Sequence, residues 1–348
     1  MARHKVIGPD DPKYPAIKHA QRIAWMKTIL GYLMMGGLVF LALWAFGFSY
    51  HFKLGFGTLW FFVPVVMWLL SAKVSLILTK SVPADPSNPR DAHLIELVRQ
   101  VWEKSGLTKM PPVYISDNPL PNAFATGPFH SWAVVAATKG LFECGMTDAE
   151  IKAVFAHELG HVKNYDVALN SFISVLSMIF FSIVDTGVRA LLGSIRIFKR
   201  MFGMAPERKG LFTGVLEWVI MYIVFQITGQ VTKVVQMFVV RSRESGADAT
   251  GALILGQPCD LAVALQKLVA YVEKHRPQGR DKEMYRALRP MMTIDPLFDS
   301  RAAEPQPKTL WQKIKAFWQY LQLSHPPVPE RIKMLEYMNG SACPVVSA

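Results

Sequence analysis

The stretch Ala156-His157-Glu158-Leu159-Gly160-His161 carries an HExxH pattern inside a segment that predicts one helix. Histidines four residues apart lie one above the other on a helix face, so both imidazoles can reach one metal ion. The glutamate after the first histidine faces the same cleft, where it can take a proton from a water that the metal activates. The alternative is a pair of surface histidines with an incidental glutamate, and the position of the motif well inside a helix disfavours it.

A defined start supports this helix. Thr147-Asp148-Ala149-Glu150 reads as a capping box, which predicts a helix from Asp148 to about Asn164. Zinc in a hydrolase takes three protein ligands and leaves a fourth position for water. A third histidine six residues after His161 would supply the missing ligand, but position 167 is Val, so the ligand has to come from elsewhere.

Glu244 is the leading candidate for the third ligand. It opens a predicted helix just after an apolar run, which could return the chain to the HExxH helix. Asp248 lies one turn further on the same helix face and could accept a hydrogen bond from a ligand imidazole. Taken alone, Glu244 and Asp248 would more often be part of a helix-surface ion-pair cluster with Arg241 and Arg243.

The composition favours a membrane protein. Charged residues make up 18% and hydrophobic residues 51% of the 348 positions, whereas soluble proteins carry about 25% charged residues. The net charge of +12 would suit a nucleic-acid partner, but no nucleic-acid-binding pattern accompanies it. The basic residues lie beside apolar runs, so positive-inside topology and anionic lipid explain the charge better, and we expect no nucleic acid.

The three cysteines, Cys144, Cys259 and Cys343, are too few and too scattered to predict a disulfide framework or a Cys-rich zinc site. An odd count without a pairing pattern fits a reducing compartment, so we expect the catalytic side to face the cytosol.

Four uncharged runs cover residues 28–50, 54–72, 167–184 and 218–232. The first two predict a transmembrane hairpin, since a span needs roughly 20 apolar residues. Basic residues before the first run place the N-terminus in the cytosol. The second pair is ambiguous, because the loop between its runs is basic. Either the two runs span as a hairpin, which we favour, or they are apolar helices packed beside the catalytic domain at the inner surface.

The expected fold is a mainly α integral membrane protein with an N-terminal transmembrane hairpin, an α+β zincin-like catalytic domain with a small β-sheet, and a second apolar helical pair. The predicted divisions are a basic arm (1–27), the hairpin (28–80), the first part of the catalytic domain (81–166), the second apolar pair with its basic loop (167–240), and the second part of the catalytic domain with the third ligand (241–348). The arm suits either a solvated tail or a contact with lipid headgroups.

Periodicity and turn residues predict the remaining elements. We expect a helix over 91–104 that Gly106 ends, a strand near 112–115, and a hairpin or pair of edge strands over 123–125 and 132–137. From Arg241 onward the chain is expected to be soluble, with helices over 243–255, 260–273, 311–321 and 330–338.

In combination these motifs resemble those of the HtpX-type membrane zinc metalloproteases. The matching features are HELGH with Asp166 five residues later, Glu244-x-x-x-Asp248, Asn122-Ala123-Phe124-Ala125-Thr126-Gly127, and Ser324-His325-Pro326-Pro327 followed by Arg331-Ile332. The resemblance covers about residues 28–338. The prenyl (CAAX) proteases are more distant relatives with seven spans, so four apolar runs favour the HtpX branch. The long basic arm and the basic loop are departures from the family.

The resemblance implies a multi-pass endopeptidase of the bacterial inner membrane whose catalytic domain faces the cytoplasm and degrades misfolded or damaged membrane proteins. It implies that His157, His161 and Glu244 hold one zinc ion and that Glu158 is the general base. His325 and Arg331 are candidates for stabilising the oxyanion. The simpler alternative is that His325-Pro326 builds a turn and that Arg331 pairs with an acid.

In the same family, the counterpart of Asn122 to Gly127 is an edge strand along which substrate lies, in contact through main-chain hydrogen bonds that select unfolded segments. The implied partners are such substrates and the lipid bilayer, and assembly into a homo-oligomer stays open. Two other functions are considered: a processing protease for defined, for example prenylated, peptides, and a non-catalytic membrane scaffold.

Overall fold

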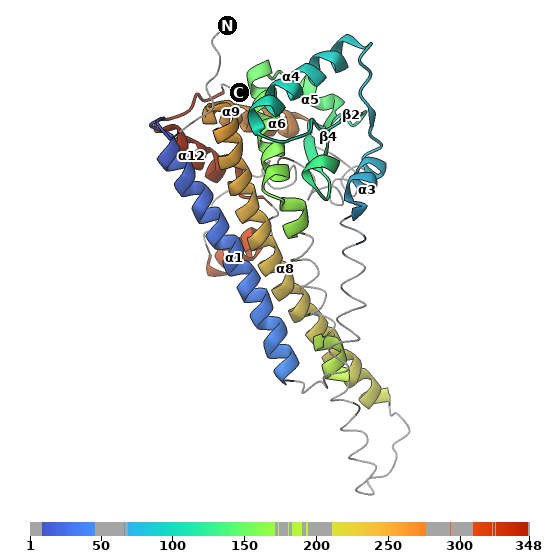
Figure 1. Ribbon diagram of the computed structural model, residues 1–348. Coiled ribbons are helices and arrows are strands. Elements are labelled where there is room, and N and C mark those ends of the chain that lie inside the picture. The colour runs from blue at the N-terminus through green and yellow to red at the C-terminus, as the bar shows by residue number, and fades with distance from the viewer. Residues whose placement is uncertain are drawn as a thin grey trace, which may run out of the picture.

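Two long helices form the stem of the molecule. The computed structural model describes residues 9–45, 66, 69–170, 173, 180, 183–189, 193, 211–275, 293, 309–321, 323 and 325–346. Helix α1 (Tyr14–Ala45) and helix α8 (Leu211–Leu255) lie side by side, and most of the other described elements gather at one end of this pair (Figure 1).

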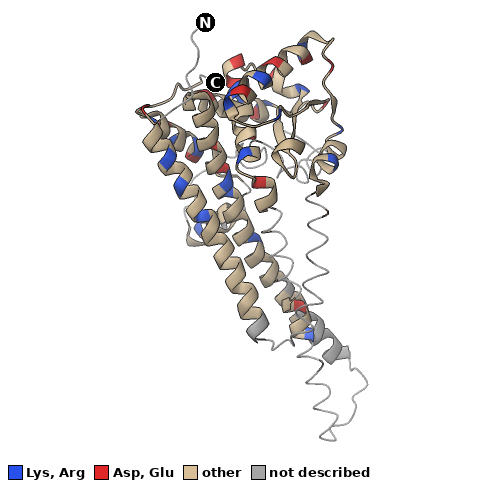
Figure 2. Ribbon diagram, in the orientation of Figure 1, with Lys and Arg blue, Asp and Glu red and all other residues tan. Residues whose placement is uncertain are grey.

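Both stem helices are long and apolar enough to cross a membrane, over Tyr14–Ala42 and Tyr222–Leu255. The part of α1 that follows Lys27 carries no charge, and its lower stretch is tan in Figure 2. Large apolar side chains such as Leu33 and Phe40, both 68% exposed, point outward from it. By length and composition, both stem helices are therefore candidates to span a membrane.

The two stem helices approach closely at Gly31. A Cβ atom there would lie 2.3 Å from Val239 Cγ2, so the absence of a side chain lets the helices meet. Val239 also belongs to an apolar cluster that joins α1 and α8 to parts of the third apolar run. Its buried members are Met35, Ala42, Ile173, Phe180, Ile183, Val235 and Val239. Most of the predicted second run (54–72) and much of the third (167–184) lie outside the described residues.

A four-stranded sheet lies at the end of the stem where the other elements gather. Its strand order is β1-β2-β4-β3. Its strands are β1 (Val82–Pro83), β2 (Val113–Ser116), β3 (Ala123–Thr126) and β4 (Val134–Thr138). Strands β2 and β4 are parallel, and the other two pairings are antiparallel. The prediction of a strand near 112–115 and of paired strands after it is confirmed, and β3 is an edge strand of this sheet.

Helices enclose the core next to this sheet. Helix α4 (Pro89–Ser105) ends at Gly106, whose φ of 74° is the left-handed conformation that glycine adopts readily. Helix α6 (Asp148–Lys163) begins with the predicted capping box at Thr147. Buried residues of both helices pack with α9 (Pro258–Lys274), α12 (Val328–Asn339) and the end of α8. The shorter helices are α3 (Ser71–Leu78), η1 (His130–Trp132), α5 (Lys139–Glu143) and α11 (Leu310–Leu321).

The structure corrects two expectations about helix ends. Glu244 does not open a new helix, because α8 runs without a break from residue 211 to Leu255. No proline interrupts it, and the polar side chains after Val239 are buried against neighbouring elements instead of ending the helix in water. Helix α1 begins at Tyr14, so residues 14–27 of the predicted arm are helical and continuous with the first span.

The cysteine spacing predicted no disulfide framework, and it gave no indication of the one disulfide that the structure contains. Cys259 at the start of α9 is bonded to Cys343 beyond α12, across a sequence separation of 84 residues. The spacing of the cysteines gave no signal for this pair, because the packing of α12 on α9 brings them together. The cysteine count therefore no longer supports a reducing compartment.

Candidate metal centre

Helix α6 presents His157 and His161 on one face, as their spacing predicts. Their Nε2 atoms lie 3.2 Å apart, and the His157 side chain is 1% exposed. Gly160 lies between them, where a Cβ atom would come within 2.9 Å of the Ala247 carbonyl oxygen of α8. A glycine at this position therefore lets α8 come close to the helix that carries the histidines.

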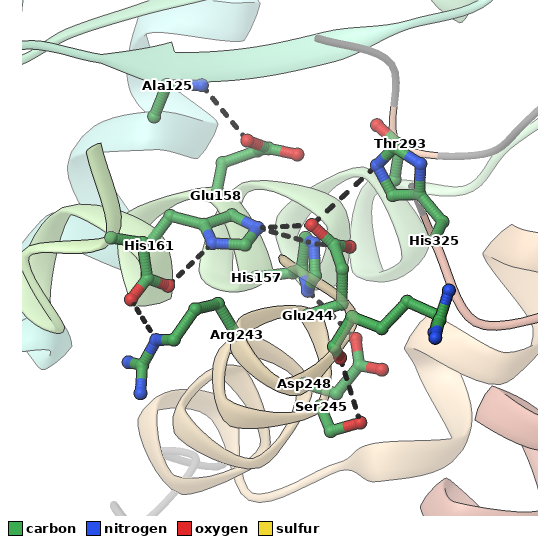
Figure 3. Close-up of polar contacts among 12 residues, drawn as sticks. Ala125, His157, Glu158, His161, Arg243, Glu244, Ser245, Asp248, Thr293 and His325 are labelled. Atoms are coloured by element: carbon green, nitrogen blue, oxygen red, sulfur yellow. Dashed lines mark hydrogen bonds and ion pairs between the residues drawn. The ribbon is translucent and has the colours of Figure 1, made fainter. Parts of the chain in front are cut away.

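Glu244 comes from α8 and points at both histidines (Figure 3). Its Oε2 lies 3.6 Å from His157 Nε2, and its Oε1 lies 3.4 Å from His161 Nε2. Ligand atoms of His157, His161 and Glu244 all lie within 4.8 Å of one another, so this group could hold a metal ion. The predicted third ligand is thus placed beside the motif.

The spacing and the chemistry of these side chains fit zinc. Tetrahedral zinc with ligand bonds of about 2.0–2.1 Å holds its ligand atoms about 3.3 Å apart. The separations of 3.2, 3.4 and 3.6 Å bracket that value. In addition, Glu244 Oε2 is buried and accepts no hydrogen bond from any residue that the structure describes. A buried carboxylate oxygen without a donor is costly unless a cation completes it.

Each histidine is oriented by a carboxylate on its other nitrogen. His157 Nδ1 lies 2.8 Å from Asp248 Oδ1, and His161 Nδ1 lies 2.8 Å from Asp166 Oδ2. An Nδ1–H that donates to a carboxylate leaves Nε2 free of a proton and aimed at the centre. The predicted placement of Asp248 beside an imidazole agrees with this geometry. Asp166, which follows the HELGH motif by five residues, orients the second imidazole in the same way.

Two buried arginines neutralise these carboxylates. Arg243 donates from Nε to Asp166 Oδ1 over 2.5 Å, and its guanidinium lies 4.0 Å from the ring centroid of Trp25 on α1. Arg331 of α12 donates to both oxygens of Asp248, over 3.0 and 2.7 Å. The site is therefore tied to α1 through Arg243 and to α12 through Arg331.

Arg331 and His325 contact the ligand set from the side of α12. Arg331 also donates to the Thr293 carbonyl over 2.7 Å, and its Nη1 lies 3.8 Å from Glu244 Oε2. His325 is 5% exposed, and its Nε2 lies 3.6 Å from Glu244 Oε1. Arg331 therefore pairs with an acid, which is the simpler of the two roles that the sequence analysis considers for it. A role of either residue in stabilising an oxyanion stays a prediction.

Glu158 lies between the histidines and the sheet. Its Oε2 accepts a hydrogen bond from the Ala125 amide of β3 over 3.0 Å, and the residue is 4% exposed. Burial raises the pKa of Glu158 to about 7. A carboxyl group with a pKa near neutrality can both accept and return a proton at physiological pH.

The imidazoles differ in charge. Burial lowers the pKa of His157 to about 4, so this ring is neutral, the form that ligates metal. Burial also acts to lower the pKa of His161, but the carboxylates of Glu244 and Asp166 raise it to about 9. Metal binding at this centre therefore releases a proton from His161.

The predicted substrate strand, residues 122–127, lies directly over this centre. Its residues Ala123–Thr126 form edge strand β3, which pairs with β4 on one side only. Part of its other side is already engaged, since Thr293 donates from Oγ1 to the Ala123 carbonyl and from its amide to the Asn122 side chain. Gly127 follows with φ of 143°, and a Cβ there would lie 2.6 Å from Ala133 Cα.

The crossing of α6 and α8 makes a testable prediction. A Cβ at Gly251 would lie 2.9 Å from the His157 amide nitrogen, so Gly251→Ala has to push α8 away from α6. We expect a loss of about 1–3 kcal/mol in stability and weaker metal binding, because the ligands sit on the two separated helices. The measurements are thermal unfolding and metal affinity of the full-length chain.

Gly229→Ala is the matched control on the same helix, where a Cβ would meet nothing within 4 Å. We expect it to be neutral or slightly stabilising, since alanine favours helix by up to about 1 kcal/mol over glycine. Equal effects of the two substitutions would contradict the role assigned to the crossing.

Comparisons with known proteins agree with this geometry. A family model described as Peptidase family M48 matches residues 88–339. A protein named Protease HtpX homolog from Caldanaerobacter subterraneus subsp. tengcongensis is 30% identical over 319 residues, which cover 89% of this chain and 94% of the relative. Another Protease HtpX homolog, from Tropheryma whipplei, is 34% identical over 253 residues, or 73% of this chain and 74% of the relative.

A solved structure shares the fold. The crystal structure of S. mikatae Ste24p matches with a TM-score of 0.50 at 19% sequence identity, covering 90% of this chain and 67% of that chain. At this identity the likeness concerns the fold alone.

Proposed function

The chain belongs to peptidase family M48, and on that basis we propose that it is a membrane-bound zinc endopeptidase that cleaves misfolded or damaged membrane proteins. The observation that carries the proposal is the triangle of His157, His161 and Glu244, whose ligand atoms lie within 4.8 Å of one another and include the donor types that zinc takes. The HtpX-homologue relatives, which are named proteases, support the hydrolytic chemistry.

Zinc held by these three side chains supplies Lewis-acid chemistry that activates water and polarises a carbonyl group. Glu158 then takes the proton of the attacking water and returns it to the leaving amine, which its pKa of about 7 suits. Asp248 and Asp166 hold the two imidazoles in the tautomer that aims Nε2 at the metal. His325 and Arg331 are our proposed donors to the oxyanion, since both lie beside Glu244.

The substrate class follows from strand β3. An extended segment can add to the free part of its edge through main-chain hydrogen bonds, which depend little on side-chain identity. Such recognition suits unfolded segments and a role in quality control. The Ala125 amide donates to Glu158, so a segment bound along β3 would pass beside the proposed general base.

The apolar surface of α1 bears on where the site lies relative to the membrane. Arg243 stacks on Trp25, and the exposed surface of α1 is apolar after Lys27, so Glu244 stands close to the level where α1 would enter lipid. We propose that the chain is a multi-pass protein of a bacterial inner membrane, with the catalytic end on the cytoplasmic side that the positive-inside rule assigns to its basic N-terminal segment.

Metal removal tests the function. In full-length chain reconstituted in lipid nanodiscs, we expect one zinc per chain and cleavage of an unfolded membrane protein that stops on chelation and returns with added zinc. Glu244→Ala should lower zinc affinity by more than about 100-fold, because losing even a residue that orients a ligand costs 10–100-fold. Ser245→Ala, the next position of α8, is the matched control and should retain metal.

Two outcomes would contradict the proposal. Cleavage by a metal-free Glu244→Ala protein would exclude this centre, and tight zinc binding without cleavage of any substrate would favour a scaffold. A prenylated peptide assayed in parallel distinguishes a processing protease, which would cleave it in preference to the unfolded protein.

A further inference from the structure

Helix α11 exposes an apolar face that the proposed reaction does not use. In LWQKIKAFWQYL the apolar residues recur at helical spacing and fall on one side of the helix. They are Leu310, Trp311, Ile314, Phe317 and Trp318, each between 38% and 80% exposed. The opposite side carries Gln312 and Gln319, both exposed. So many aromatic side chains on one exposed face mark an interaction surface.

The position of α11 is set by one arginine. Arg241 of α8 donates from Nη1 to the carbonyls of Tyr320, Leu321 and Leu323, over 3.1, 3.0 and 2.9 Å. Its guanidinium also lies 5.3 Å from the Tyr320 ring centroid. The last carbonyls of a helix lack partners within the helix, so this arginine both satisfies them and anchors the end of α11 to α8.

The anchor lies at the level of the lipid-facing part of α1. Gly31 of α1 faces Val239 of α8, and Trp25 faces Arg243. Arg241 lies between these two contacts along α8, so it stands level with the segment of α1 between Trp25 and Gly31. In that segment and just beyond it, Ile29, Leu30 and Leu33 are at least half exposed. In Figure 1, α11 is the unlabelled orange-red helix, and it packs on α8.

Whatever covers the apolar face of α11 has to be apolar. It also has to be continuous with the medium that covers the exposed apolar surface of α1. A helix of 12 residues is about 18 Å long, too short to cross a hydrocarbon layer of about 30 Å. A short helix with Trp and Phe on one face and Gln and Lys on the other suits the headgroup boundary. The net charge of +12 favours a surface that contains anionic lipid.

We propose that α11 is an in-plane membrane helix whose apolar face inserts between the headgroups and upper acyl chains of the phospholipid bilayer. The inference rests on the proposed membrane location but not on proteolysis. It makes Arg241 the link between a membrane-surface element and Glu244, which lies one turn further along α8. The catalytic end is thereby held against the bilayer by a contact separate from the spanning helices.

Photo-crosslinking tests this placement. The photoreactive residue p-benzoylphenylalanine is introduced at position 311 or 317 of the full-length chain, and at 312 or 319 as matched positions on the polar face. The protein is reconstituted in nanodiscs of phosphatidylethanolamine and phosphatidylglycerol, irradiated and analysed by mass spectrometry. We expect phospholipid adducts at 311 and 317 in several-fold higher yield than at 312 and 319.

Three results would overturn the inference. Covalent dimers at 311 and 317 would show that a second copy of the chain covers the face. Absence of adducts at these positions would show that water covers the face. Equal lipid adducts at all four positions would show that the whole helix is immersed in lipid. Zinc content and cleavage are measured on the same samples. If the difference in lipid adducts between the two faces is absent but cleavage is intact, only the α11 placement is contradicted. If the lipid adducts form as expected but no cleavage occurs, only the proposed function is contradicted.

Discussion

Glu158→Gln is expected to lower the rate of peptide cleavage by about 10²–10⁴-fold, the contribution of a positioned general base. The amide keeps the shape of the side chain but cannot take a proton from water. Its amide oxygen can still accept the hydrogen bond from the Ala125 amide, so the fold around β3 should persist. Because Glu158 is not among the three side chains whose atoms surround the centre, zinc content should be unchanged.

The measurement pairs a cleavage rate with a metal analysis on the same sample. Glu103→Gln on α4 is the matched control, since this glutamate is exposed and its ion pair among the described residues is with Arg99 at the surface. It should leave both quantities unchanged. Full cleavage by Glu158→Gln would remove Glu158 from the mechanism, and loss of zinc would mean that Glu158 supports the metal centre instead.

The local part of the site could be predicted from sequence. Two histidines four residues apart fix their own geometry on a helix, and the capping box at Thr147 defines where that helix begins. The edge strand was also predicted, because alternating small and apolar residues bounded by turns describe β3 and β4. In each case the signal and the structure lie within the same short segment.

What escaped prediction depends on contacts between distant segments. The unbroken course of α8 past Arg243 was not predicted, and it holds because Arg243 contacts Asp166 and Trp25 inside the protein. Asp166 is a local exception: it orients His161 from five residues away, across the helix break at Tyr165, whose φ is 57°. The Cys259–Cys343 bond likewise follows from the packing of α12 on α9.

The buried pair of Arg331 and Asp248 should be the most sensitive point for stability. Arg331→Met leaves Asp248 buried with no guanidinium, and removal of one partner of a buried ion pair costs about 3–5 kcal/mol. Asp248 also orients His157, so zinc affinity should fall as well. Thermal unfolding and zinc titration of the full-length chain measure the two effects. Lys333→Met, at an exposed position of the same helix, should change neither.

A double substitution separates the two roles considered for Arg331. Arg331→Met combined with Asp248→Asn removes both charges, so stability should recover in part because no unpaired charge stays buried. If the single and double variants unfold alike, the pair with Asp248 is not what Arg331 contributes to stability. If Arg331→Met instead keeps full stability and zinc affinity but loses cleavage, the arginine acts on the oxyanion, as the sequence motif suggests. Since both of its Asp248 bonds are short and its side chain is 1% exposed, we expect the loss of stability.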